Sequence, residues 1–292
     1  MYGGCKRKWY KKGKELLEEI AGTDLPENEA AVWYIGQCGF VVKKRSIIYV
    51  DPVLNDIWDE NGNTVRLYEP PYSPNSASAD YVLCTHAHID HMAVETIRGI
   101  CGNNPQVLLV VPGVCREILL AEGIEEERIV EAVSEKKICL PGVEIIPFST
   151  AHPRHEVGED GRESSLAYYV NCEQISFLHM GDTFLTERLT RSLKKYPGPD
   201  ILMVPVNGSD FYLERKDIIG NMSAREAAKF SKELGADLVI PMHFDMIDGN
   251  TVNPTDFIEE LWHVDSGMKF SIPALGERII YRRRERHGNH CL

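Results

Sequence analysis

Short apolar runs of strand length recur along the chain and alternate with a few segments of helical periodicity. A helix is predicted over residues 10–22, where Leu16, Leu17 and Ile20 share one face. Strands are predicted at residues 31–35, 40–42, 46–50, 80–85, 107–111, 143–148, 166–170, 175–178, 201–206 and 237–242. This content is richer in strands than a simple doubly wound parallel sheet, so it favours two packed sheets with helices outside.

The remaining helices are predicted from their end signals. Residues 92–101 have a helical pattern, and Pro112 opens another helix that ends at Gly123. The clearest helix spans residues 223–234, because Ser223 and Glu226 form a capping box and Gly235 follows the last turn.

No linker divides the chain. Residues 1–292 are therefore expected to form a single domain, with residues 1–29 as an N-terminal helical extension. A polar stretch rich in Asn and Pro, residues 55–79, is predicted to be an exposed loop.

The most informative pattern is an H-x-H-x-D-H sequence that directly follows a predicted strand. It contains His86, His88, Asp90 and His91. A lone histidine is usually structural, but three histidines and one aspartate in so short a segment can direct their side chains at one point. Imidazole and carboxylate groups bind zinc and similar divalent ions. The sequence therefore predicts a metal site here.

Three further candidate ligands each lie just beyond the C-terminal end of a predicted strand. They are His152, Asp182 and His243. Loops on a rigid scaffold are where binding residues concentrate, so this shared placement favours one common site over three unrelated structural roles. Together the two sets predict a centre with two metal ions rather than a single zinc.

The order of these motifs resembles the metallo-β-lactamase superfamily from about residue 30 to residue 280. The resemblance implies an α/β sandwich in which two mixed sheets pack face to face with helices on the outer faces. It assigns one metal to His86, His88 and His152. It assigns the second to Asp90, His91 and His243, with Asp182 as a bridge. Asp51, at the end of the strand 46–50, is implied to orient a histidine ligand.

Three shorter stretches resemble the ascorbate-6-phosphate lactonase branch of this superfamily. They are residues 31–36, 222–227 and 239–245. This resemblance implies a lactonase for a small sugar-acid-like lactone, with or without a phosphate group. Residues 55–79 and 153–165 do not match the branch, so we expect substrate choice to lie there.

The predicted cofactors are two divalent ions, zinc or manganese. Two such ions about 3.5–4 Å apart can hold a hydroxide that attacks a carbonyl carbon or a phosphorus. Asp90 is predicted both to bind metal and to orient this nucleophile. Protonation of the leaving group needs a nearby acid, for which His155 and His179 are candidates.

Substrate binding is predicted for four residues close to the candidate ligands. Asn207, Arg215 and Lys216 belong to the loop after the strand 201–206, and Arg154 follows His152 closely. Arginine and lysine side chains can bind a phosphate or a carboxylate. A solvated charged loop is the alternative interpretation.

Composition narrows the partners. The chain has 44 acidic and 32 basic residues and a formal net charge of -12, which disfavours nucleic acid. No signal peptide is expected, and no apolar run is long enough to predict a membrane-spanning segment. The eight cysteines are scattered and lie partly in apolar runs, for example Cys84 and Cys139, so buried free thiols are expected. We therefore predict a cytoplasmic protein that has a small-molecule substrate and no nucleic-acid or membrane partner. The sequence leaves open whether it forms a homo-oligomer.

Three alternatives to the lactonase prediction remain. A phosphodiesterase of the same fold comes second. A redox di-iron protein is third. The resemblance implies that such members usually have a glutamate where His88 stands, together with a flavin domain, and neither is seen in this sequence. A non-catalytic metal-binding protein would be expected to have lost ligands, yet every candidate ligand is present.

Overall fold

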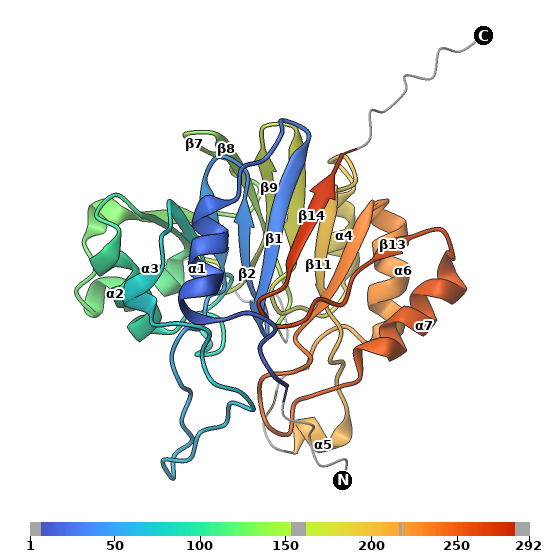
Figure 1. Cartoon of the computed structure of the whole chain (residues 1–292). Coiled ribbons are helices and arrows are strands. Elements are labelled where there is room, and N and C mark those ends of the chain that lie inside the picture. Colours follow the sequence, from blue (N-terminus) through green and yellow to red (C-terminus); the bar gives the residue numbers. More distant parts are fainter. Residues whose placement is uncertain (1–6, 153–161, 216–217, 219, 284–292) are drawn as a thin grey trace.

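The computed structural model describes residues 7–152, 162–215, 218 and 220–283. In this part of the chain, two seven-stranded sheets pack face to face between helices (Figure 1). The first sheet has the order β14 (Arg278–Arg282), β1 (Glu29–Gly36), β2 (Gly39–Lys43), β3 (Ile47–Val50), β4 (Tyr81–Leu83), β5 (Leu108–Pro112) and β6 (Ile129–Ala132). The second has the order β13 (Lys269–Phe270), β12 (Leu238–Met242), β11 (Ile201–Pro205), β10 (Ile175–His179), β9 (Leu166–Cys172), β8 (Val143–Ser149) and β7 (Ile138–Leu140).

Both sheets are mixed. In the first sheet, β1, β2 and β3 pair antiparallel, whereas β3 to β6 pair in parallel. In the second sheet, β7 to β10 pair antiparallel and β10 to β13 in parallel. The predicted sandwich of two mixed sheets with outer helices is confirmed.

Helices cover the two outer faces (Figure 1). On the side of the first sheet lie α1 (Gly13–Gly22), α2 (Val94–Asn103) and α3 (Gly113–Ala121). On the side of the second lie α4 (Glu187–Leu193), α6 (Ala224–Leu234) and α7 (Pro254–Val264). The short elements are α5 (Phe211–Glu214) and the 3-10 turns η1 (Pro74–Ser76) and η2 (Glu126–Arg128). None of the helices in the described ranges is long and apolar enough to cross a membrane.

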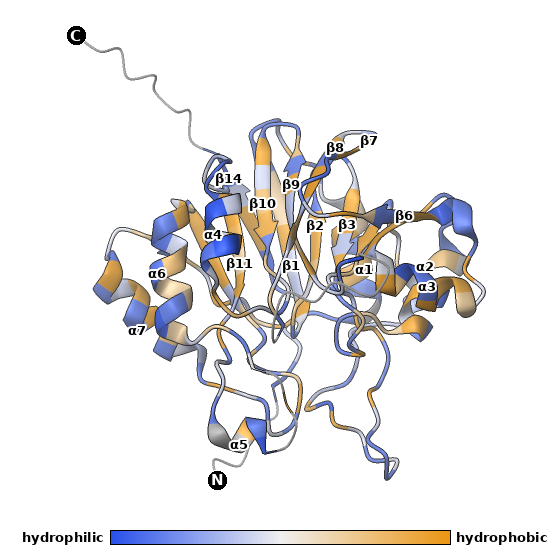
Figure 2. Cartoon of the chain, turned by 180° about the vertical axis from the view of Figure 1, so that it is seen from behind, coloured by the Kyte–Doolittle hydropathy of each residue, from blue (hydrophilic) through white to orange (hydrophobic). Residues whose placement is uncertain are grey.

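Strand β1 shows why the strands are apolar on both faces. Val32 and Tyr34 point into the core between the two sheets, whereas Trp33 and Ile35 point into the core beneath α1, α2 and α3. A strand buried on both faces reads as a continuous apolar run rather than as an alternating pattern. Figure 2 shows these apolar strands at the centre of the molecule, with hydrophilic residues on the outer surface of α4.

All four predicted helices are confirmed, as α1, α2, α3 and α6. Helix α1 begins at Gly13, three residues later than predicted, and α6 has the predicted capping box between Ser223 and Glu226. Gly235 ends α6 in the left-handed conformation, with φ of 68°. The sequence did not predict α4, α7 or the edge strands β6, β7, β13 and β14. Edge strands are short and partly exposed, so their hydrophobic pattern is weak.

Two expectations about burial are wrong in part. Cys84 is buried as expected, but Cys139 is exposed because it lies on the edge strand β7. The stretch 55–79 is mostly irregular, as predicted, but it is not simply exposed. Arg66 and Tyr68 within it are buried, because this stretch runs beside the chain that follows β12 and pairs with it at Ile247.

Candidate metal centre

The candidate ligands meet at one end of the sandwich because each follows a strand that ends there. The H-x-H-x-D-H segment follows β4, while the three single candidates follow β8, β10 and β12. The turn between β1 and β2 and the residue after β3 lie at the same end, which faces downward in Figure 1. Rigid strands therefore fix every side chain of the site at its base.

One group of ligand atoms comes from His86, His88 and His152. A ring nitrogen from each of the three lies within 4.8 Å of the others. The Nε2 atom of His152 is 3.3 Å from Nδ1 of His88. His86 and His152 are buried, whereas His88 is exposed to solvent.

A second group comes from His91, Asp182 and His243, joined by Cys38. The Nε2 atom of His91 is 3.3 Å from Oδ1 of Asp182, and Nε2 of His243 is 3.1 Å from Oδ2 of Asp182. Asp90 lies slightly farther out, with its Oδ2 atom 3.5 Å from Nε2 of His243 and 3.7 Å from Nε2 of His91.

Asp182 lies between the two groups. Its Oδ2 atom is 3.6 Å from Nε2 of His152 in the first group and 3.1 Å from Nε2 of His243 in the second. A carboxylate with one oxygen close to both groups has the placement that a bridging ligand requires. The structure thus brings together all seven residues that the sequence predicted as metal ligands.

Asp51 supports this cluster from behind. Its Oδ2 atom is 2.7 Å from Nδ1 of His91, and its Oδ1 accepts a hydrogen bond of 2.7 Å from the backbone N–H of Thr85. A carboxylate on Nδ1 leaves Nε2 of the same imidazole to face the centre, which is the usual support for a metal-binding histidine. Asp51 has a φ of 45°, so its backbone adopts the left-handed region that non-glycine residues avoid.

Gln37 and Cys38, both in the turn between β1 and β2, were not predicted from the sequence. Nε2 of Gln37 donates a 2.8 Å hydrogen bond to Oδ2 of Asp90, and the Cys38 thiol is 3.8 Å from Oδ1 of Asp182. Gln37 also has a left-handed backbone, with φ of 56°, as does His243, with φ of 61°. The sequence signal that could have identified them is their position between Gly36 and Gly39, directly after an apolar strand.

His179 was one candidate for the acid, but both of its ring nitrogens are occupied. Nε2 contacts the backbone carbonyl of Cys38 at 2.8 Å, and Nδ1 accepts from the backbone N–H of Gly181 at 3.2 Å. The ring is completely buried. His179 therefore holds the β1–β2 turn against β10. The other candidate, His155, lies outside the described residues.

The environment of the site shifts the pKa values of its histidines in opposite directions. Burial lowers the pKa of His243, but Asp182 and Asp90 outweigh burial and raise that pKa to about 9. Burial also lowers the pKa of His91, but Asp182, Asp90 and Asp51 outweigh burial and raise that pKa well above its usual value. Burial dominates at His152 and lowers its pKa to about 4, and it lowers the pKa of His86 as well.

The donor set fits divalent metal ions. Nε2 of His86 and Nε2 of His91 are buried and form no hydrogen bond, although Nε2 of His91 lies 3.3 Å from Oδ1 of Asp182. Buried polar atoms normally have hydrogen-bond partners, so these two nitrogens are suited to bind a metal ion. Imidazole and carboxylate groups are suitable ligands for zinc, manganese or iron.

A cavity of about 250 Å³ opens onto this cluster. Its polar wall contains His88, Asp90, His152, Asp182, His243 and Asn250. Its other wall is aliphatic and consists of Ile57, Val65, Ile89, Ile218 and Ile247. No lysine or arginine lines the cavity among the residues that the structure describes.

Neither of the two predicted substrate-binding residues that the structure describes, Asn207 and Arg215, is in the lining of this cavity. Asn207 is buried behind it, where its Nδ2 donates a 3.1 Å hydrogen bond to Oδ1 of Asn250. Asn207 also accepts a 2.9 Å bond from Nδ2 of Asn221. Arg215 is exposed just after α5. Arg154 and Lys216 lie outside the described residues.

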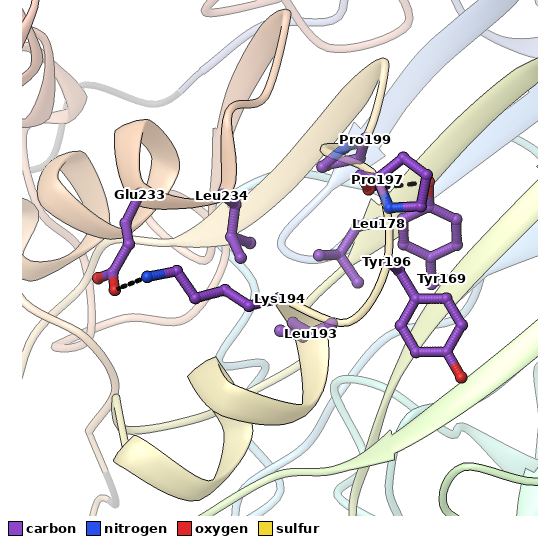
Figure 3. Close-up of a pocket in the computed structure, with 9 residues that line it drawn as sticks. All are labelled: Tyr169, Leu178, Leu193, Lys194, Tyr196, Pro197, Pro199, Glu233 and Leu234. Carbon is purple, nitrogen blue, oxygen red and sulfur yellow. Dashed lines mark hydrogen bonds and ion pairs between the residues drawn. The ribbon is translucent and has the colours of Figure 1, made fainter.

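Another cavity, of about 410 Å³, lies between the end of α4 and the end of α6 (Figure 3). It is lined by Leu178, Leu193, Leu234 and Tyr196 among others, and contains none of the candidate ligands. Its lysine and glutamate neutralise each other, because Nζ of Lys194 is 2.7 Å from Oε1 of Glu233. The chemistry of this protein is therefore assigned to the smaller cavity at the histidine cluster.

Solved structures resemble this fold over most of its length. A metallo hydrolase from Ignicoccus hospitalis, Igni18, has a TM-score of 0.66 at 18% identity and covers 88% of this chain and 100% of its own. CmlA, a diiron β-hydroxylase from Streptomyces venezuelae, has a TM-score of 0.63 at 16% identity and covers 93% of this chain but 60% of its own. At these identities the likeness establishes the fold alone.

Sequence comparison identifies the family. A curated relative from Methanopyrus kandleri, named a UPF0173 metal-dependent hydrolase, is 27% identical over 253 residues, which is 84% of this chain and 97% of the relative. These comparisons do not bring out the narrower ascorbate-6-phosphate lactonase branch, so that resemblance stays a prediction. A model of the beta-lactamase superfamily domain matches residues 31–243, which include every candidate ligand. The chain belongs to the metallo-β-lactamase superfamily.

Proposed function

We propose that this protein is a metal-dependent hydrolase with two divalent ions, and that it cleaves a small, largely apolar carbonyl compound of the lactone type. The observation that carries the proposal is the two-sided cavity, in which one wall is the histidine and carboxylate cluster and the other is aliphatic. The name of the Methanopyrus kandleri relative, a metal-dependent hydrolase, agrees with the reaction class.

Each ligand has a proposed place. His86, His88 and His152 would hold one ion, Asp90, His91 and His243 the other, and Asp182 both. When bound, such ions polarise a carbonyl and lower the pKa of water so that it attacks near neutral pH. The amide of Gln37 fixes Oδ2 of Asp90, so this carboxylate can accept a proton from the attacking water in one defined direction.

The aliphatic wall supports the proposed substrate class. Ile57, Val65 and Ile247 make one side of the cavity apolar, and that side offers no charged group to a substrate. A phosphodiester carries a negative charge that would find no lysine or arginine among the described lining residues. A neutral ester or lactone needs none, so we place it ahead of a phosphodiester and ahead of a phosphorylated lactone.

A substrate panel tests the proposal. Protein reconstituted with zinc or manganese is assayed against lactones of increasing alkyl length, thioesters and phosphodiesters. We expect turnover of lactones, with kcat/KM rising with alkyl length, and loss of turnover in Asp182→Asn. The matched control is Asp256→Asn, at the exposed start of α7, which should retain activity. Turnover of phosphodiesters alone would favour the phosphodiesterase alternative. If the purified protein binds no stoichiometric metal, the proposed hydrolase is wrong.

A further inference from the structure

A larger cavity, of about 830 Å³, lies on the opposite side of one wall of the metal cavity. Residues 57–65 form this wall as an antiparallel turn, in which the N–H of Val65 donates to the carbonyl of Ile57 at 2.9 Å. Ile57 and Val65 line the metal cavity, whereas Thr64 and Arg66 line the larger one. Alternate residues of the same segment thus face two different cavities.

Arg66 is the unusual residue of the larger cavity. Its side chain is 6% exposed, and its guanidinium donates only to neutral backbone carbonyls, those of Val53, Asn55 and Tyr68. The Nη2 atom is itself buried and has no hydrogen-bond partner, and Arg66 makes no ion pair within the described ranges. A buried cation without a counter-ion is costly, so it normally has an anionic partner.

The surrounding charges do not supply that partner. Asp56 and Glu69 also line the cavity, but Glu69 pairs with Lys12, and Asp56 attracts Arg66 only from a distance. Lys8 lines the cavity as an exposed lysine with no partner in the described part of the chain. The other cations of the lining, Arg7 and Lys12, pair with Asp245 and Glu69. Among the described lining residues, Arg66 and Lys8 therefore face only the exposed carboxylate of Asp56, unlike the balanced pair Lys194 and Glu233 of Figure 3.

Two aromatic rings stand beside these cations. The rings of Trp9 and Tyr68 meet edge to face, with centroids 5.9 Å apart, and both residues line the cavity. The Arg66 guanidinium lies over the Tyr68 ring, 5.5 Å from its centroid. An aromatic surface next to unpaired cations suits a ligand that carries a ring and an anionic group.

We propose that this cavity is a second binding site, distinct from the metal centre, for a small organic anion. Its carboxylate or phosphate group would contact Lys8 and be attracted by the charge of the buried Arg66, and its ring would pack against Trp9 and Tyr68. The site shares the segment 57–65 with the metal cavity but none of the candidate metal ligands.

The test is a calorimetric titration of the metal-loaded protein with phenyl phosphate and with inorganic phosphate. We expect one saturable site for phenyl phosphate and weaker binding of inorganic phosphate, because the latter lacks the ring. Since phosphate also binds metal ions, the titration is repeated with Asp182→Asn, which should keep this site. A buried charge attracts an anion over several ångströms, so Arg66→Gln should weaken phenyl phosphate binding about threefold or more.

Two further variants keep the test decisive if Arg66→Gln fails to fold. Lys8→Gln removes an exposed charge without affecting the core, and should weaken phenyl phosphate binding at least about threefold, as expected for a partly screened contact. Arg191→Gln, an exposed arginine on α4, is the matched control and should bind normally. The proposal is wrong if no saturable binding occurs, if Asp182→Asn abolishes it, or if Lys8→Gln and a folded Arg66→Gln leave it unchanged. Equal affinity for both probes would overturn the part assigned to the rings.

Discussion

The side-chain amide of Gln37 donates a 2.8 Å hydrogen bond to Oδ2 of Asp90, so the turn between β1 and β2 orients a carboxylate of the proposed metal centre. Gln37→Ala removes this bond and leaves Asp90 free to rotate. We expect metal affinity or kcat to fall about 10- to 100-fold, as for other residues that orient metal ligands. Chelator competition and steady-state kinetics measure the two effects. Gln174→Ala, in the exposed turn between β9 and β10, should change neither.

Asp51 supports His91 in a comparable way. Asp51→Asn keeps the size of the side chain and tolerates the left-handed backbone, but replaces the charged acceptor on Nδ1 of His91. The imidazole then becomes a weaker ligand, and we expect about a 10- to 100-fold loss in affinity for the metal that His91 holds. Metal content after dialysis against graded chelator measures this loss. Retention of both ions at wild-type affinity would show that Asp51 does not orient the ligand.

Gly181 precedes Asp182 and has a φ of 58°, and a Cβ there would lie 2.8 Å from Cβ of Thr85. Gly181→Ala therefore adds both backbone strain and a clash with the Thr85 side chain, directly before Asp182 in the chain. We expect a loss of about 1–3 kcal/mol in the free energy of unfolding together with impaired metal binding. Gly123→Ala is the matched control, because Gly123 has a φ of 82° but no atom within 4 Å of its Cβ position. It should lose stability through strain alone and retain its metals.

Metal affinity should rise with pH. His243 has a pKa of about 9 in the metal-free protein and binds metal only as the neutral imidazole, so a proton must leave for each metal bound below that pH. We expect affinity to increase about tenfold per pH unit for this proton, between about pH 6 and pH 9, and more steeply if His91 also releases one. Titrations with a fluorescent chelator at several pH values measure the slope. A flat profile would contradict the assignment of His243 as a ligand, and His263→Gln on α7 should leave the slope unchanged.

The candidate ligands could be found from sequence because each stands next to a strong local signal. The H-x-H-x-D-H segment is contiguous, and His152, Asp182 and His243 each follow a readable apolar strand. Gln37 and Cys38 could not be assigned in the same way. Their role depends on how the two sheets pack, which brings the turn after β1 within 3.8 Å of a carboxylate that follows β10 in the other sheet.

The character of the cavity was still harder to predict. Its aliphatic wall comes from Ile57 and Val65 in a stretch that reads as a polar loop, and from Ile89 inside the metal motif itself. Scattered isoleucines in irregular chain carry no periodicity, so only the folded arrangement shows that they share one surface. For the same reason, Arg66 was indistinguishable in sequence from a solvated arginine.

The left-handed backbones of Gln37, Asp51 and His243 have a consequence for how this enzyme can evolve. Glycine would relieve the strain at each position, and selection for thermal stability alone would favour it. Each such exchange would delete a contact at the metal centre. Gains in heat resistance that preserve activity should therefore accumulate elsewhere, and a glycine at any of these three positions in a diverged descendant would mark a lineage that has abandoned the ancestral chemistry.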